Sequence, residues 1–508
     1  MEGVDAALEQ ATHGVSACVW HRFVADTITP VAAALRLMTP ERGDFLLESV
    51  EGGEVRGRYS LLGLDPDLLY RAKGYNAQIN RDWQTDQSAF ADCPGHPLEQ
   101  LQALHTACRY NPPEALPPAL ACLVGYVGFE SVSLVEPCTA PASDPLDLPD
   151  ILFVRPTVLI VFDQLKDEAY CIAPVWPDAS ASGEAPGRLV AKAQQRIEVT
   201  LAQLRTTGGP NTPSSLPHAK HTPSGLVPTP TLSPARYAGM VGRAQEYIAA
   251  GDIFQVVLAQ RFTAPFSLPP IALYRALRRV NPSPFLYFLD LPGFAIVGSS
   301  PEILVRVRDG DVTIRPIAGT RPRGATPAED VAAEAELLAD PKERAEHLML
   351  LDLGRNDVGR IAEAGSVQVT ASYTVERYSH VMHIVSNVTG HLAEEHSALD
   401  AVMAGFPAGT VSGAPKIRAC EIIAELEREA RGPYAGAVGY LAPDGSLDSC
   451  IVLRTAVLKD GMMHVTAGAG IVAESNAASE QRECEAKAGA LFAAAREALA
   501  LAGHGTAS

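Results

Sequence analysis

Two hydrophobic periodicities occupy separate blocks of this 508-residue chain. The N-terminal part is rich in short apolar runs bounded by turn residues, which are typical of β-strands. Residues 44–49 and 151–154 are such runs, and 157–162 and 169–172 predict a hairpin across the polar stretch between them. The spacing of apolar residues over 189–204 predicts a helix that closes this part of the chain.

The C-terminal part mixes both periods. Its predicted helices cover 234–250, ending at Gly251, and 326–351, which begins with a hydroxyl cap and a proline and which Pro341 could interrupt. Its predicted strands are 254–260, 294–297, 303–307 and 312–317. Because strands and helices come in non-alternating blocks, the pattern predicts an α+β fold in which antiparallel sheets pack against helices.

One break in composition divides the chain. Residues 206–234 are rich in Pro, Gly, Ser and Thr and have almost no apolar periodicity, which is typical of a linker or a long surface loop. The break predicts an N-terminal domain over 1–205 and a C-terminal domain over 235–500, each within the size range of one large domain.

Composition and charge exclude several functional classes. The 41 basic and 59 acidic residues give a net charge of −18, so neither nucleic acid nor an anionic membrane surface is an expected partner. The N-terminus lacks the apolar core of a signal peptide, and no apolar run is long enough for a membrane span. The nine cysteines are scattered without C-x-x-C spacing, which favours a reducing cytoplasm and disfavours zinc. The glycine-rich motifs of dinucleotide and P-loop binding do not occur.

Two pairs of glutamates have the same helical spacing. Glu343 and Glu346, and later Glu480 and Glu483, stand at positions i and i+3 of predicted helices, so each pair occupies one helix face. Four carboxylates arranged in this way suit a hard divalent ion such as Mg²⁺, which prefers oxygen ligands. Each pair alone is more typical of a solvated helix surface, so the metal prediction depends on the neighbouring motifs.

Two glycine-containing segments are candidates for contact with an anion. In 316–324 a predicted strand runs into Gly319, where backbone can approach a ligand closely, and a hydroxyl and two cations follow at Thr320, Arg321 and Arg323. A plain hairpin with two solvated arginines is an equally good interpretation of that segment. The small residues Gly468, Ala469 and Gly470 suggest backbone amides turned toward an anion, as at a helix start or in a nest.

Together with four further segments, these motifs resemble the signatures of the chorismate-utilising enzymes, and among them of the large subunits of anthranilate synthases (component I). The further segments are 298–302, 377–383, 407–416 and 448–455. The resemblance runs from about residue 45 to 487, apart from the linker and 75–94, with six motifs in the family order. It implies the chorismate-binding fold, chorismate as the substrate and Mg²⁺ as the cofactor.

The resemblance also implies roles for single residues. Glu302 matches the general acid that protonates the leaving C4 hydroxyl of chorismate. His383 matches the histidine of the second step, loss of pyruvate, although a single histidine in a strand is otherwise typical of a core residue. Glu346 and Glu483 match the Mg²⁺ ligands, with Glu343 and Glu480 beside them.

The remaining matched positions surround the substrate. Gly319, Thr320 and Thr410 match the lining of the ring pocket, with Thr410 counted among the catalytic residues. The groups that match the binding of the enolpyruvyl carboxylate are Tyr434, Arg454, Gly468, Ala469 and Gly470, and Lys487 adds a cation near the metal. An arginine suits this task because its planar fork can pair with a carboxylate through two bonds.

Two positions discriminate between branches of the family. Gln255 stands where relatives that add water carry a lysine able to act as a base, so it fits ammonia as the nucleophile. Ala318 stands where the aminodeoxychorismate branch carries a lysine, which favours the anthranilate branch. The alternatives are therefore an aminodeoxychorismate synthase component I and, from another class, a catalytically idle tryptophan-sensing subunit. The second would have lost carboxylates such as Glu302 and Glu346, yet both are present.

Two segments more than 200 residues apart match those that bind tryptophan in feedback-inhibited members. The matched positions are Leu47, Glu48, Ser49, Asn281, Pro284, Phe285 and Leu286, together with Cys450. Residues 281–284 alone would also be typical of a turn. Members often carry Tyr-Met where this chain has Phe285-Leu286, so the strength of inhibition stays open.

The source of ammonia is expected to be a second chain. No Gly-x-Cys-x-Gly nucleophile of a glutamine amidotransferase surrounds any of the nine cysteines. The resemblance therefore implies a separate amidotransferase subunit (component II) and a hetero-oligomer in the cytoplasm.

Overall fold

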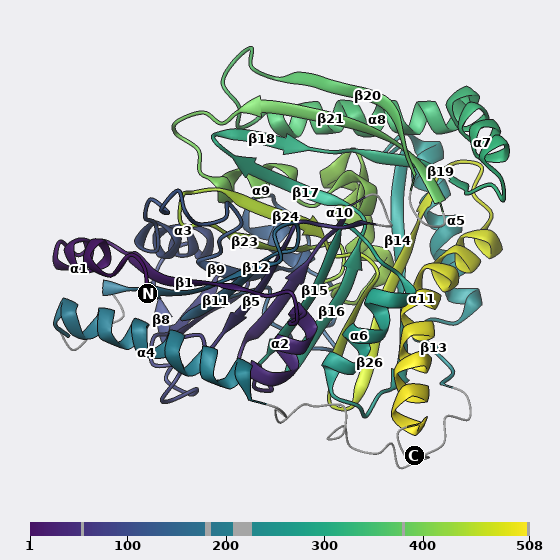
Figure 1. Cartoon of the computed structure of the whole chain (residues 1–508). Helices are drawn as coiled ribbons and strands as arrows, with labels where there is room; N and C mark the ends of the chain where they lie inside the picture. Colours follow the sequence, from purple (N-terminus) through teal and green to yellow (C-terminus); the bar gives the residue numbers. More distant parts are fainter. Residues whose placement is uncertain (52–54, 178–183, 207–225, 378–380, 505–508) are drawn as a thin grey trace.

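Two large antiparallel sheets packed face to face form the centre of the molecule (Figure 1). The computed structural model describes residues 1–51, 55–177, 184–206, 226–377 and 381–504. Tyr126 of the second sheet meets Phe294 of the first edge to face, with ring centroids 6.2 Å apart, so the hydrophobic core lies between the sheets. The architecture confirms the predicted α+β class with antiparallel sheets.

The first sheet joins strands from both sides of the predicted linker. In spatial order its strands are β1 (Ala17–Val24), β12 (Glu168–Val175), β11 (Val158–Asp163), β5 (Tyr59–Leu64), β2 (Asp44–Glu48), β15 (Phe285–Leu291), β16 (Phe294–Ser300), β25 (Thr455–Lys459), β26 (Met462–Ile471), β14 (Gln255–Pro265) and β13 (Thr229–Pro230), with β22 (Gly413–Ala414) also beside β14. The junction between the two parts of the chain is the pairing of β2 with β15, in which Glu48 lies opposite Leu286.

The second sheet is shared in the same way. Its strands are β19 (Ile317–Pro322), β21 (Val381–His391), β18 (Asp311–Ile314), β17 (Ile303–Arg308), β24 (Leu447–Ile451), β23 (Ala437–Leu441), β9 (Leu123–Val127), β10 (Ile151–Arg155), β6 (Leu68–Lys73), β7 (Asn76–Asn80) and β8 (Ala91–Cys93), with β20 (Gln368–Arg377) beside β21. Here β23 and β9 form the junction. A two-stranded pair, β3 (Val50–Glu51) and β4 (Val55–Arg56), stands apart from both sheets.

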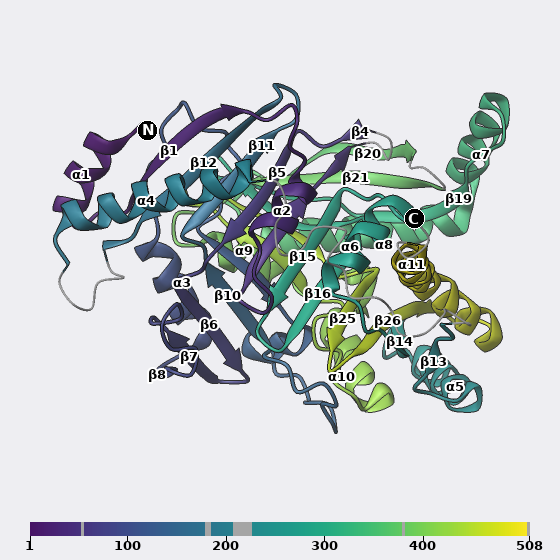
Figure 2. The ribbon, with the colours of Figure 1, turned by 60° about the horizontal axis from the view of Figure 1, so that its bottom comes forward.

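Helices cover the outer faces of the sheets (Figures 1 and 2). They are α1 (Val4–Thr12), α2 (Pro30–Leu37), α3 (Pro97–Ala107), α4 (Pro186–Arg205), α5 (Pro234–Ala250), α6 (Pro270–Val280), α7 (Pro327–Ala339), α8 (Pro341–Gly359), α9 (Ala398–Gly405), α10 (Lys416–Glu427) and α11 (Ala477–His504), with short 3₁₀ turns at Phe129–Leu134 and Gly409–Val411. None of the helices in the described ranges combines the length and the hydrophobicity that a membrane span requires.

Local sequence explains where the helices near the site begin. The Thr326 hydroxyl accepts a hydrogen bond from the Glu329 amide and caps α7, as the sequence predicted. Pro341 does interrupt the helical stretch, because Asp340 ends α7 and its carboxylate then caps α8. Figure 2 shows α7 extending away from the body of the molecule, while α8 packs on β19 and β21.

Three predictions of local structure need correction. The strand expected over 312–317 is two strands, β18 and β19, which pair with successive parts of β21. Gly468-Ala469-Gly470 lies within β26, paired with β14, so it is neither a helix start nor a nest. The expected linker contains β13 and meets α5 at Pro234, while residues 207–225 and positions 378–380 of the 377–383 motif lie outside the described residues.

Close packing inside the first sheet depends on a glycine beneath an aromatic ring. Phe45 in β2 lies opposite Gly63 in β5, and a Cβ added at Gly63 would stand only 2.0 Å from Phe45 Cζ. No such space is available in the buried centre of the sheet, because Phe45 is 1% exposed and cannot move outward.

Gly63→Ala and Gly239→Ala are therefore expected to change stability in opposite directions. Gly63→Ala forces the Phe45 ring to shift, and overpacking of this kind costs roughly 1–3 kcal/mol. Gly239 lies inside α5 with nothing within 4 Å of an added Cβ, so alanine there should add up to about 1 kcal/mol through helix propensity. Urea unfolding followed by circular dichroism measures both. Equal effects of the two substitutions would contradict the packing argument.

Candidate functional site

A buried carboxyl group stands where the chain passes from one sheet to the other. Glu302 lies between β16 of the first sheet and β17 of the second. The backbone of β24 fixes this crossing, since Ser300 Oγ donates to Ile451 O at 2.6 Å and Ile451 N donates to Glu302 O at 3.0 Å. The Glu302 side chain is 8% exposed and accepts a hydrogen bond from Thr410 Oγ1 at 3.2 Å.

The environment of Glu302 keeps it protonated at neutral pH. Burial raises the pKa of Glu302 to about 8, against the opposing effects of the Thr410 hydroxyl and of the charges of Arg454 and Lys487. A carboxylic acid with such a pKa can donate a proton to a leaving group near pH 7. Thr410 holds the acceptor oxygen in place from the Gly409–Val411 turn.

A histidine and a hydroxyl face each other across the neighbouring strands β19 and β21. Thr320 pairs with His383, and His383 Nδ1 lies 3.1 Å from Thr320 Oγ1 and 3.0 Å from Gly319 O. Because a carbonyl oxygen only accepts, Nδ1 carries the proton and Nε2 is the basic nitrogen of the ring. Burial lowers the pKa of His383, so the ring is neutral near pH 7 and can take up a proton.

Gly319 determines the backbone geometry beside the Thr320–His383 pair. Its φ of 72° accompanies a shift in the register between β19 and β21 at Ala318 and Thr320. An added Cβ at Gly319 would lie 3.1 Å from Glu343 Oε2, so the glycine also lets α8 approach the strand. Ala318 itself is 8% exposed and packs in the core.

Three of the four predicted metal-binding glutamates interact electrostatically. Burial raises the pKa of Glu346, and the negative charges of Glu343 and Glu483 raise it further. The fourth, Glu480, lies on α11 and its charge acts on the phenol of Tyr237, and no interaction in the described residues links it to Glu346. Among the described residues, no three His, Cys, Asp or Glu side chains are gathered closely enough to bind one metal ion.

The donor chemistry nevertheless fits Mg²⁺. This ion keeps several of its waters and is commonly held by one or two carboxylates together with substrate oxygens, so a closed set of protein ligands is not required. Glu346 makes no hydrogen bond or ion pair within the described ranges. Burial is the main cause of its raised pKa, the charges of Glu343 and Glu483 add to it, and those of Lys342 and Lys487 oppose it. A cation beside Glu346 would offset the two negative charges.

The two arginines of the 316–324 segment have other partners than a substrate. Arg321 bonds to the carboxylates of Glu336, Asp340 and Glu343, and Arg323 bonds to Asp330. The prediction of an anion-binding corner at these two arginines is therefore wrong. Their charges are engaged by acidic residues of α7, of α8 and of the turn between these helices.

Further predicted substrate-binding residues lie on β26, on β14 and in the segment before β23. A Cβ at Gly468 would lie 2.8 Å from the Tyr434 hydroxyl, and a Cβ at Gly470 would lie 2.5 Å from Gln255 Nε2. Both glycines thus make room for a polar side chain over the strand. Between them, Ala469 is fully buried and pairs with Leu258.

The two remaining predicted substrate-binding residues are the cations Lys487 and Arg454. Lys487 Nζ lies 2.7 Å from Glu483 Oε1 and donates to Gly468 O at 2.9 Å. The charge of Arg454 acts on both Glu302 and His383. The interactions shown among the described residues thus join Glu302 to Thr410 and Arg454, and His383 to Thr320 and Arg454. At the other end they join Glu346 to Glu343, Glu483 and Lys487.

One buried ion pair in this region is not predicted from the sequence. Arg431 bonds to Glu427 through Nε and Nη2, at 2.9 and 2.5 Å, and its side chain is 1% exposed. The only signal is the i, i+4 spacing, which also occurs on exposed helices. Its guanidinium lies against the ring of Tyr434, 5.5 Å from the centroid.

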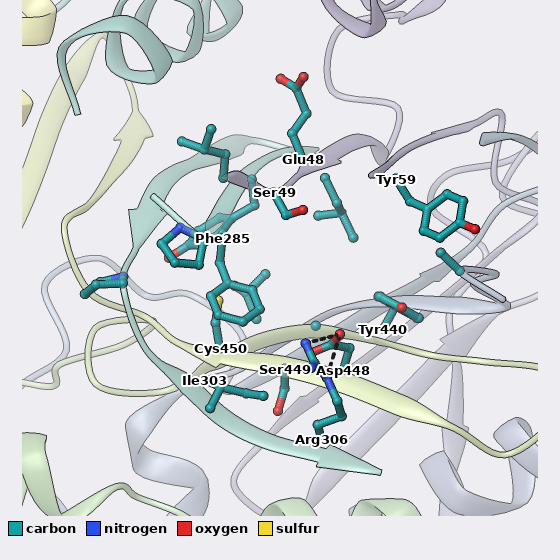
Figure 3. Close-up of a pocket in the computed structure, with 18 of the residues that line it drawn as sticks. Glu48, Ser49, Tyr59, Phe285, Ile303, Arg306, Tyr440, Asp448, Ser449 and Cys450 are labelled. Atoms are coloured by element: carbon teal, nitrogen blue, oxygen red, sulfur yellow. Dashed lines mark hydrogen bonds and ion pairs between the residues drawn. The ribbon is translucent and has the colours of Figure 1, made fainter. Parts of the chain in front are cut away.

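A separate cavity of about 750 Å³ is lined by residues of the two predicted tryptophan-binding segments (Figure 3). The pairing of β2 with β15 brings these distant segments together. Among the residues that line the cavity are Leu47, Glu48, Ser49, Pro284, Phe285, Leu286 and Cys450. Asn281 does not line it and instead accepts a hydrogen bond from Ser299 through its backbone oxygen.

The carboxylate of Glu48 points away from this cavity (Figure 3). It accepts hydrogen bonds from Tyr274 Oη at 2.6 Å and Arg278 Nη2 at 2.9 Å, both from α6. The expected contact of Glu48 with a ligand is therefore limited to its backbone and inner atoms. Ser49, by contrast, is directed into the cavity, opposite the ion pair of Asp448 and Arg306.

Comparison with known proteins agrees with this geometry. Residues 60–493 match the family of chorismate binding enzymes. The anthranilate synthase component 1 of Cereibacter sphaeroides is 50% identical over 96% of this chain and 95% of its own length, and that of Pseudomonas aeruginosa is 47% identical over 93% and 94%. The crystal structure of anthranilate synthase component I from Streptococcus pneumoniae superposes with a TM-score of 0.74 at 35% identity, covering 93% of this chain and 99% of that one. The chain therefore belongs to the family of chorismate-binding enzymes and, within it, to the anthranilate synthase component 1 group.

Proposed function

We propose that the chain is the component I of an anthranilate synthase, which converts chorismate and ammonia into anthranilate, pyruvate and water. The observation that carries the proposal is the protonated Glu302 beside Thr410, together with the charge of Arg454, which acts on both Glu302 and His383. The relatives named anthranilate synthase component 1 support this branch over aminodeoxychorismate synthase. An idle sensing subunit would have no use for a buried acid of this kind.

The first step is an exchange of substituents on the ring. Glu302 donates its proton to the C4 hydroxyl, which leaves as water while ammonia adds at C2. Gln255 has no basic group, and ammonia needs none to attack. Arg454 and Tyr434 would hold the enolpyruvyl carboxylate, with the Tyr434 hydroxyl accommodated over Gly468 of β26.

The second step makes the ring aromatic. The C2 proton is removed while the enolpyruvyl group departs and takes up a proton to give pyruvate. His383 Nε2 is the neutral base available in this corner, and the Nδ1–H bond to Gly319 O fixes the tautomer. Thr320 Oγ1 keeps the ring orientation.

Mg²⁺ is the proposed cofactor. Glu346 and Glu483 would hold it, with Glu343 beside them and Glu480 at most through water. When bound, it would neutralise the ring carboxylate of chorismate and so orient the substrate. Lys487, paired with Glu483, adds a further positive charge at this end of the site.

Regulation by tryptophan is proposed for the separate cavity. Its lining offers apolar contacts from Leu47, Phe285 and Ile303 and polar groups from Ser49 and Asp448, which suits an amino acid with a large aromatic side chain. The cavity lies directly behind the catalytic acid, because Pro301 and Ile303 line it on either side of Glu302 in the sequence.

Ammonia would come from a separate glutamine amidotransferase subunit, in a hetero-oligomer. This follows from the term component 1 in the names of the relatives and from the missing amidotransferase nucleophile. We place the enzyme in the cytoplasm, because its nine cysteines are free thiols, which a reducing compartment preserves.

The purified chain should form anthranilate from chorismate, Mg²⁺ and ammonium at alkaline pH, as followed by product fluorescence and chromatography. EDTA should abolish turnover and Mg²⁺ should restore it. Glutamine should replace ammonium only when an amidotransferase subunit is added. Full activity after exhaustive chelation would overturn the metal proposal, and glutamine-dependent turnover by the pure chain would overturn the two-subunit proposal.

Substitutions at Glu302 and His383 should separate the two steps. Glu302→Gln should lower chorismate consumption by about 10²-fold or more, because a positioned general acid contributes that much. His383→Met should let the aminated, pyruvyl-bearing intermediate accumulate, which chromatography detects. His391→Met is the matched control, since His391 is a half-exposed histidine of the same strand. If His383→Met yields only unreacted chorismate, the histidine acts in the first step.

The first step should also depend on pH with a defined sign. Since Glu302 must be protonated to act and its pKa is raised to about 8, the rate should fall as pH rises through that value. The rate is measured at a constant concentration of unprotonated ammonia. A rate that is flat from pH 7 to 9 would contradict the role of Glu302.

Ser49→Phe should relieve inhibition by tryptophan and leave the KM for chorismate nearly unchanged. The new ring would occupy part of the cavity, and overpacking by roughly 1–3 kcal/mol weakens binding about 5-fold to 150-fold. Pro284→Ser, which changes a second residue that lines the cavity, should act in the same direction. Ser372→Phe, at an exposed position of β20, is the control. Calorimetry that finds no tryptophan binding to the unaltered protein would remove the regulatory site.

A further inference from the structure

The edge of β14 has a gap in its ladder of backbone hydrogen bonds. At one end β22 pairs with residues 255 and 256, and at the other end β13 pairs with residues 262 and 263. The backbone groups between these contacts are buried, because Val257 and Ala259 are 4% and 3% exposed. Buried backbone groups without partners are costly, so something must replace the missing strand.

The ion pair of Arg431 and Glu427 fills this gap. Arg431 Nη2 donates to Val257 O at 2.8 Å, and Glu427 Oε1 accepts from Ala259 N at 2.8 Å. One side chain thus supplies the donor and the other the acceptor that a neighbouring strand would offer. The same two groups bond to each other, so their charges are compensated inside the protein.

Arg431 also reaches the turn that carries Thr410. Its Nη1 donates to Val411 O at 2.8 Å, one residue after Thr410. The guanidinium therefore ties the Gly409–Val411 turn to β14, the strand that begins with Gln255. The Thr410 hydroxyl in turn donates to Glu302, so the position of this turn sets that contact.

The N-terminal part of the chain holds Arg431 from the other side. Glu130 accepts hydrogen bonds from the amides of Arg431 and Gly432, at 2.8 and 3.0 Å. The ring of Phe129 lies 4.6 Å from the guanidinium carbon. Arg431 is thus fixed on every side and is engaged by protein groups, which leaves it no role as a ligand of the substrate carboxylates.

We propose that Arg431, held by Glu427, is a positioning residue that sets the Thr410 turn against β14 and so maintains the hydrogen bond from Thr410 to the catalytic acid Glu302. The inference rests on the proposed function only in taking Glu302 as the acid. It concerns the placing of Thr410 and assigns Arg431 no contact with chorismate.

Arg431→Lys and Glu427→Gln test the proposal. Lysine keeps the charge but cannot serve Val257 O, Val411 O and Glu427 together, since it lacks the planar fork. The kcat for anthranilate formation should fall about 10-fold to 100-fold, as for other small displacements of catalytic groups. Glu427→Gln keeps an acceptor for Ala259 N and should have a smaller effect in the same direction. Arg418→Lys, on the same helix α10 as Glu427 but about one-third exposed, is the control and should leave kcat unchanged.

The pH profile separates positioning from a general loss of stability. The Thr410 hydroxyl lowers the pKa of Glu302, so a displaced Thr410 should move the alkaline limb of kcat to higher pH. Arg454 and Lys487, the other groups that act on Glu302, are unaltered in these variants. Arg431→Lys and Thr410→Val should shift this limb in the same direction, and the double variant should shift it no further.

Hydrogen exchange gives a readout that does not depend on activity. In Arg431→Lys the amides of 257–259 and 409–413 should exchange faster than in the unaltered protein, while the amides of α5 should not. Unchanged exchange in both segments would overturn the proposal, and so would faster exchange with an unmoved pH limb in Arg431→Lys when Thr410→Val does move that limb. If Thr410→Val itself leaves the limb in place, the assignment of Glu302 as the acid fails, and the exchange data still decide on the positioning.

Discussion

Protonation of Glu302 at neutral pH is the constraint on which the architecture around the site depends. Burial disfavours the charged form of a carboxyl group, and Glu302 is buried where the chain crosses from the first sheet into the second. The crossing is held by Ser300 and by Ile451 of β24. Too much burial would make the acid too weak, and the charges of Arg454 and Lys487 act against the effect of burial. The resulting pKa of about 8 suits proton donation near pH 7.

The same crossing brings the separate cavity next to the acid. Pro301 and Ile303 line the cavity, while Glu302 between them faces Thr410. Cys450 also lines it, and the next residue, Ile451, bonds to the backbone of Glu302. A ligand in the cavity would therefore touch the residues on both sides of the acid and the strand that fixes it. In the proposed regulation, a ligand in the cavity would therefore act directly on the groups around Glu302, because a close-packed core transmits small displacements.

The elements around the candidate site that the sequence predicted correctly are those with local signals. The spacing of Glu343 and Glu346 placed both on one helix, and Thr326 and Pro341 marked helix starts because capping needs only neighbouring residues. Motif matches selected Glu302 and His383 as candidates for catalysis, since a match of consecutive residues needs no knowledge of the fold.

What the sequence could not predict depends on partners that are distant in the chain. Arg321 was interpreted as a ligand for an anion, but three carboxylates of α7, α8 and the turn between them engage it. Gly468–Gly470 was interpreted as a nest, but β14 pairs with it and makes it a strand. The i, i+4 pair of Glu427 and Arg431 looks like a surface pair, and only the gap in the edge of β14 explains its burial. Each of these outcomes follows from strand pairing and burial, which local patterns do not encode.

The distribution of charge in the site explains how a chain with a net charge of −18 can receive a substrate with two carboxylates. At one end, in the proposed function, Arg454, whose charge acts on Glu302 and His383, would supply the positive charge for one carboxylate. At the other end, Arg321 and Lys487 form ion pairs with Glu343 and Glu483, whereas Glu346 forms no ion pair in the described residues, although the charges of Lys342 and Lys487 act on it. Adding a substrate carboxylate there would raise the repulsion further. In the proposed function, a divalent ion would remove both difficulties at once, because it would offset the charge of Glu346 and attract the incoming carboxylate. In the proposed function, the order of binding follows from this argument, since the ion must be present before the substrate carboxylate can approach.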